Sequence, residues 1–230
     1  MNPLLKVEEA EKSRKLPSSI IKKIKKRIKY VEDGISKIES ASGLKYPSYY
    51  VEPILPLSSS HIEAYQIGVL YARIMPIETF TGLEILVQIS APLVVFGLKT
   101  TIRAVLAHEF LHYIELLRRF NNLDIVSDSL STSLFESLYS DYGKLFEPKL
   151  IFKDRKLIKL LDEKFSNGPH DEKLHEKTLK KWIEKSLPTI NLSPDSNIIR
   201  VPVSLILNMK IDPLLKLKLE ELERKGYERD

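Results

Sequence analysis

The sequence predicts an α+β protein, and two kinds of stretch in its first half carry that prediction. Short runs rich in Ile, Val, Leu and Tyr predict strands at about 49–54, 65–74 and 83–90, with a turn around Pro76 between the last two. Residues 99–120 contain neither Pro nor Gly and place apolar side chains on more than one face, so they predict a buried helix.

One long amphipathic helix is predicted in the N-terminal region. We interpret residues 1–17 as a polar lead-in and residues 18–41 as a helix, with Ser18 or Ser19 as its N-cap. Its apolar residues recur at four-three spacing, as Ile24, Ile28, Val31, Ile35 and Ile38. The basic run 22–29 then occupies the solvated face of this helix, which argues against a nucleic-acid partner.

The second half of the chain is predicted to be mostly helical. Residues 154–165 and 171–187 are interpreted as helices, 187–197 as a Pro-containing loop, and 198–206 as a strand or a buried turn. Asp212 followed by proline is typical of a helix start and predicts a final helix to about residue 225. We expect residues 18–230 to form one domain, in which the N-terminal helix and the helical C-terminal half wrap the central part of the chain.

Composition limits the class of protein. The chain has 230 residues, of which 43% are hydrophobic, enough to fill a sizeable core. It contains no cysteine, which excludes disulfides and cysteine ligands to a metal. The N-terminus lacks the apolar segment of a signal peptide, and the longest apolar run, 91–98, is too short to span a membrane. We therefore expect a cytoplasmic protein without a membrane partner.

The most specific motif lies inside the predicted buried helix. His108, Glu109 and His112 form the pattern HExxH, written HEFLH here. Residues i and i+4 of a helix share one face, so both imidazoles can reach one metal ion. Glu109 lies close enough to act on a water molecule at that metal without being a ligand itself. Two histidines and a glutamate buried without a metal would each need other partners.

The residues 105–114, VLAHEFLHYI, resemble the extended signature of the zincin metallopeptidases. The resemblance implies a small, twisted, mostly antiparallel sheet packed on an active-site helix that carries both histidines. It further implies that the edge strand beside the cleft can pair with a peptide, and 83–90 is the candidate for that strand. One Zn²⁺ per chain is expected, with a second helix bringing the third ligand.

The residues that follow the HExxH motif narrow the choice among the zincin subclasses. Metzincins continue as HExxHxxGxxH, whereas this chain has Glu115 and Arg118 at the last two positions. A gluzincin-like site with a downstream Glu, or an SprT-like site with a downstream His, remains. Glu136 is the preferred third ligand because a carboxylate in so apolar a stretch requires a partner. The alternatives are His170, His175 and Asp128.

These observations predict a zinc-dependent metallopeptidase that acts on a peptide or protein substrate, with His108, His112 and Glu136 as ligands and Glu109 as general base. Gluzincins often carry an acid four positions after the third ligand, but this chain has Ser140 there. The oxyanion-stabilising donor stays open among Tyr139, Tyr142, His175 and Arg200. Two alternatives were weighed: an SprT-like, nucleic-acid-associated protease and a catalytically silent zincin-fold scaffold.

Overall fold

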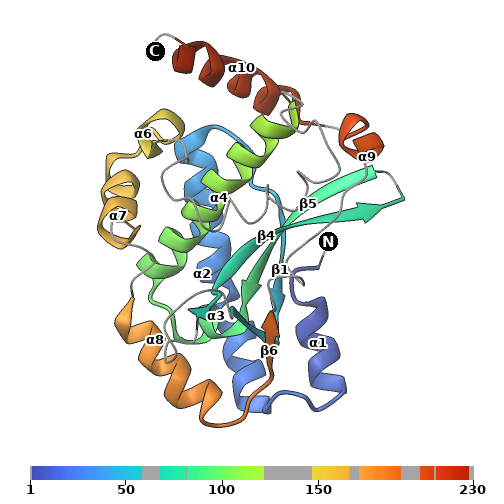
Figure 1. Cartoon of the computed structure of the whole chain (residues 1–230). Helices are drawn as coiled ribbons and strands as arrows, with labels where there is room; N and C mark the ends of the chain where they lie inside the picture. The colour runs from blue at the N-terminus through green and yellow to red at the C-terminus, as the bar shows by residue number, and fades with distance from the viewer. Residues whose placement is uncertain are drawn as a thin grey trace.

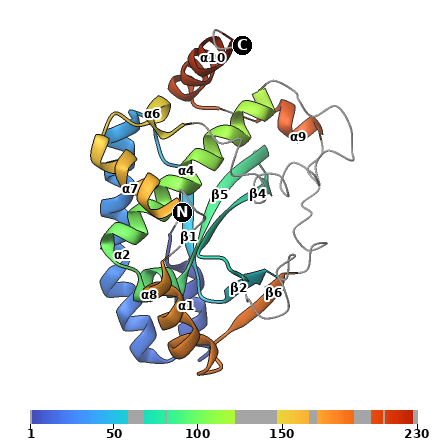
Figure 2. The same cartoon turned by 60° about the vertical axis from the view of Figure 1, so that its left-hand side comes forward.

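The protein combines helices with two small sheets, as Figure 1 shows in a computed structural model of the chain, and the predicted α+β class is confirmed. The structure describes residues 2–58, 68–80, 82–121, 147–165, 171–192, 203–209 and 211–227. Long helices lie along one side of the main sheet (Figure 2), and the helices between residues 148 and 183 lie on that side as well.

The main sheet has the strand order β1-β5-β4. β1 (Ser48–Glu52) pairs with β5 (Gly82–Ser90) in parallel, and β4 (Ala72–Thr79) pairs with β5 in antiparallel fashion. The expectation that 83–90 forms the edge strand is therefore wrong, because β5 is the central strand and β4 is an edge. The predicted turn at Pro76 is also wrong, since Pro76 lies inside β4, where an edge strand tolerates proline.

A second sheet has the order β3-β2-β6. β2 (Leu55–Ser58) is antiparallel to β3 (Gly68–Val69) and parallel to β6 (Thr189–Leu192). Each sheet thus has one parallel and one antiparallel pairing, which corrects the expectation of a mostly antiparallel sheet. β6 also falls inside the predicted loop 187–197, because a strand of four residues becomes regular only through pairing with the distant β2.

Two long helices pack against each other on one side of the main sheet and contribute many of the buried apolar side chains. α2 (Ser18–Ser42) buries the predicted stripe, with Ile24, Val31 and Ile38 fully buried. It begins after Pro17 without a side-chain cap, so the predicted serine N-cap is wrong. α3 (Ala91–Phe96) is capped by Ser90 and leads into α4 (Lys99–Asn121), which matches the predicted buried helix almost residue for residue.

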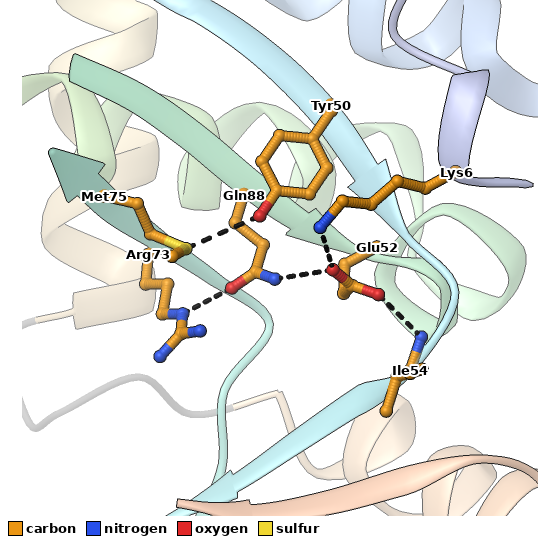
Figure 3. Close-up of polar contacts among 7 residues, drawn as sticks. All are labelled: Lys6, Tyr50, Glu52, Ile54, Arg73, Met75 and Gln88. Atoms are coloured by element: carbon orange, nitrogen blue, oxygen red, sulfur yellow. Dashed lines mark hydrogen bonds and ion pairs between the residues drawn. The ribbon is translucent and has the colours of Figure 1, made fainter. Parts of the chain in front are cut away.

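The predicted polar lead-in contains a short helix. α1 (Leu5–Lys12) lies beside β1 and buries Val7 and Ala10. Its docking involves a buried polar network (Figure 3), in which the Glu52 carboxylate accepts hydrogen bonds from Lys6 Nζ and Gln88 Nε2, both at 2.9 Å. The network satisfies polar groups on the sheet face that alternates with the apolar core face.

Further helices complete the described chain: α6 (Pro148–Ile151), α7 (Arg155–Phe165), α8 (Glu172–Thr178), the π-helical turn η2 (Leu179–Ile183), α9 (Val203–Leu207) and α10 (Pro213–Tyr227). Asp212 Oδ1 accepts hydrogen bonds from the first amides of α10, as its position predicts. α9 corrects the strand or buried turn expected at 198–206 for the part that the structure describes. Within the described residues, every helix is too short or too polar to cross a membrane.

Candidate metal centre

α4 places the three residues of the HExxH pattern inside the molecule. It is a helix of 23 residues whose apolar side chains, such as Leu106, Phe110 and Ile114, are fully buried. His108, Glu109 and His112 retain only 8%, 6% and 5% of their exposed surface. Three ionisable groups so far from water require partners or must lose their charge. The burial of the motif is therefore the first feature of the site that needs a chemical explanation.

The two histidines converge on one point. His108 Nε2 lies 3.0 Å from His112 Nε2, and the rings meet edge to face at 86°. Two imidazole nitrogens bound to one tetrahedral zinc ion at about 2.1 Å would lie about 3.4 Å apart. A shift of a few tenths of an ångström therefore converts the observed arrangement into a pair of zinc ligands. The residues fit this metal in both donor type and spacing.

Burial keeps both imidazoles neutral. It lowers the pKa of His108 to about 3, with a further contribution from the charge of His112, and lowers the pKa of His112 to about 4. A neutral imidazole is the form that binds a metal ion. At neutral pH the protein therefore presents two ligands that need release no proton before a metal binds.

Glu109 has a buried carboxyl oxygen, Oε2, without a described hydrogen-bond partner. Burial raises the pKa of this carboxyl to about 8. A carboxyl group without a partner in a buried site is costly to maintain for structure alone, and a raised pKa at a candidate catalytic position is typical of functional sites.

An aromatic ring from α7 completes one wall of the site. Phe165 stacks on the His108 imidazole, with a centroid distance of 4.1 Å and an interplanar angle of 3°. The contact fixes the orientation of the ring whose Nε2 faces His112. Sequence analysis missed Phe165, because nothing in the pattern of a distant amphipathic helix identifies which side chain stacks on the motif.

Glu115 occupies the same face of α4 one turn beyond His112. Its carboxylate is buried and accepts hydrogen bonds from Arg118 at 2.8 and 3.1 Å and from Arg119 at 3.0 Å. In the sequence Glu115 served only to exclude the metzincins. The i+3 and i+4 spacing of the two arginines is the signal that could have identified this ion-pair group.

A small hollow of about 30 Å³ adjoins the site on the N-terminal side of His108. Its wall includes Ala104 and Val105 of α4 and Phe165 of α7. At its margin Asp171 accepts hydrogen bonds from Thr101, Lys164 and the amide of Leu174. Burial acts to raise the pKa of Asp171, but these hydrogen bonds have the larger combined effect, so the pKa is lower than usual. The hollow is thus mostly apolar, with the Asp171–Lys164 ion pair at its margin.

The predicted third ligand lies outside the described residues. The same is true of Glu136's alternatives His170 and Asp128, and of Tyr139, Tyr142 and Arg200, offered as oxyanion donors. His175 lies half-buried on α8. Within the part of the chain that is described, no third His, Asp or Glu joins the histidine pair in a metal-binding group. Glu136 therefore stays a prediction.

No family model matches the chain, and no curated protein or solved structure is significantly similar to it.

Proposed function

We propose that the protein is a zinc-dependent peptidase in which His108 and His112 hold the metal and Glu109 is the general base. The observation that supports this proposal is the convergence of two neutral imidazoles, 3.0 Å apart at Nε2, beside a buried carboxyl group whose Oε2 lacks a described partner. A catalytic zinc takes three protein ligands and keeps one open position. Glu136 is our proposal for the third.

The chain's own residues then have distinct roles. A bound zinc would supply a polarised water and stabilise negative charge on the substrate oxygen. A nearby positive charge lowers the pKa of a buried carboxyl, so Glu109 would be ionised in the loaded site and could take a proton from the attacking water. It would then deliver that proton to the leaving amine. Phe165 keeps the His108 ring in its binding orientation.

Replacement of the base tests this mechanism directly. We expect Glu109→Gln to retain zinc but to lose at least about 100-fold in kcat/KM, because general-base catalysis typically contributes 10²–10⁴. The assay is cleavage of a fluorogenic peptide library by the full chain, with metal content measured on the same samples. Glu163→Gln, which changes an exposed carboxylate on α7, is the matched control.

The possible outcomes separate the alternatives. Full activity in Glu109→Gln would contradict the mechanism. A wild-type protein that binds zinc yet cleaves nothing in the library would instead favour a silent scaffold.

A further inference from the structure

Six basic side chains from separate parts of the sequence gather around the junction of α3 and α4. α3 contacts both α2 and α8, and Figure 1 shows it near the N-terminal half of α2. α2 contributes three of the cations, α4 contributes one, and α8 with η2 contributes two. We call the set the α3-junction cluster; its members are Lys23, Arg27, Lys29, Lys99, Lys177 and Lys181.

Two aromatic rings hold part of this cluster together. Three cations surround the Tyr30 ring, with Lys99 Nζ at 4.5 Å, Arg27 Cζ at 4.9 Å and Lys29 Nζ at 5.6 Å from its centre. Lys23 Nζ lies 5.3 Å from the centre of the Phe96 ring. Attraction to the ring faces holds the cations at these positions. The positive charges therefore converge instead of spreading along the solvated face that the sequence predicts for 22–29.

Among the residues that the structure describes, no carboxylate forms an ion pair with a side chain of the cluster. Lys23, Lys99, Lys177 and Lys181 make no ion pair there, and Arg27 donates to the backbone oxygens of Val94 and Gly97. Lys25, on another face of α2, contrasts with them because it pairs with Glu11 at 2.5 Å.

Mutual repulsion within the cluster is visible at Lys23. Its pKa is lowered, first by burial and then by the positive charges of Arg27, Lys181 and Lys177. Like charges brought together in this way destabilise the folded state. Folding alone therefore does not explain the cluster, whereas an anion bound at this surface would.

The surroundings of the cluster favour nucleic acid over a membrane as that anion. A helix that inserts into a lipid surface needs an exposed apolar face. The apolar stripe of α2 is instead buried in the core, and the exposed Leu98 at the junction is a single apolar side chain, which does not make such a face. Converging cations match the closely spaced phosphates of a nucleic-acid backbone. We propose that the α3-junction cluster binds the phosphate backbone of nucleic acid without reading its sequence.

Salt-dependent binding by the full chain tests the proposal. Fluorescence anisotropy would follow a labelled 24-nucleotide single strand of mixed sequence, and its duplex, from 50 to 300 mM KCl. We expect the affinity to fall with salt, with a slope of about 0.7–0.9 in log K per phosphate contacted. A quadruple variant should bind at least about tenfold more weakly at 50 mM KCl and show a shallower slope. It combines Lys23→Gln, Lys99→Gln, Lys177→Gln and Lys181→Gln.

A matched control removes the same charge elsewhere. A second quadruple variant changes four exposed lysines outside the cluster, by Lys37→Gln, Lys45→Gln, Lys149→Gln and Lys159→Gln. It should keep the wild-type affinity within about threefold. Two double variants, Lys23→Gln with Lys99→Gln and Lys177→Gln with Lys181→Gln, provide the test if the quadruple variant does not fold. Equal losses in cluster and control variants, or no binding at 50 mM KCl, would overturn the proposal. Binding to vesicles containing 30% phosphatidylserine, without binding to either nucleic acid, would also overturn it.

Discussion

At the scale of single residues, the buried carboxyl group of Glu109 makes the stability of the metal-free protein depend on pH. Without a metal, burial raises its pKa from 4.5 to about 8, so the folded chain holds a proton that the unfolded chain releases. Stability from this group is therefore present at low pH and is lost as the pH rises from about 4.5 towards 8. Burial imposes the opposite trend on His108 and His112, whose lowered pKa values make acid destabilising below about 6.5.

Removal of the titrating carboxyl should expose the Glu109 contribution. In chelator-treated protein, we expect Glu109→Gln to become more stable than wild type as the pH rises from 5 to 8, by roughly 1 kcal/mol per pH unit. Urea unfolding at several pH values measures the difference. Glu163→Gln should show no such trend, because its carboxylate is exposed. A difference that stays constant with pH would mean that Glu109 is not buried as described.

The residues of the metal centre differ in how far the sequence could predict them. The helical spacing of His108, Glu109 and His112 is local, so their common face could be predicted without a structure. The stacking of Phe165 on His108 depends on how α7 packs against α4. No local pattern encodes such a contact.

At the scale of elements, α2 and α4 cross closely in the turn before the site. Gly34 makes this approach possible, because a Cβ atom there would lie 3.1 Å from Leu106 Cδ1. Leu106 belongs to the helical turn that precedes His108, so this crossing helps to fix the position of the HExxH residues relative to α2. Larger residues at position 34 should therefore push the two helices apart.

Substitutions at Gly34 test that packing. We expect Gly34→Ala to be nearly neutral, since a gain of about 1 kcal/mol in helix propensity offsets a small displacement of Leu106. Gly34→Val should cost about 1–3 kcal/mol by overpacking. Ser36→Val, at an exposed position of the same helix, is the control for the helix propensity of valine. Equal unfolding free energies for the two valine variants would contradict the close crossing.

Helices were predicted better than strand partners. The periodicity of α2 and the unbroken apolar composition of α4 are local properties, and both helices appear where the sequence predicts them. The central position of β5 and the existence of β6 depend on pairing with strands far away in the chain. Strand order is therefore the part of the fold that composition and spacing leave open.

At the scale of the whole molecule, contacts between distant segments create two of the charged groups that the structure describes. The Lys6–Glu52–Gln88 network joins α1 to two strands of the main sheet. The α3-junction cluster joins α2, α4, α8 and η2. In the sequence, the basic run alone suggested only a solvated helix face, because Lys99, Lys177 and Lys181 lie far from it along the chain.

The account rests on a zinc ion bound by the converging histidines of α4. The most direct test is the zinc content per chain after removal of metal with a chelator and reconstitution, compared between wild type, His112→Ala and Glu136→Ala. We expect one tightly bound zinc in wild type and none in either variant, with Glu147→Ala, an exposed carboxylate, as a control that keeps it. Zinc retained by Glu136→Ala would move the third ligand to another residue. No zinc in wild type, or zinc retained by His112→Ala, would contradict the metal centre itself.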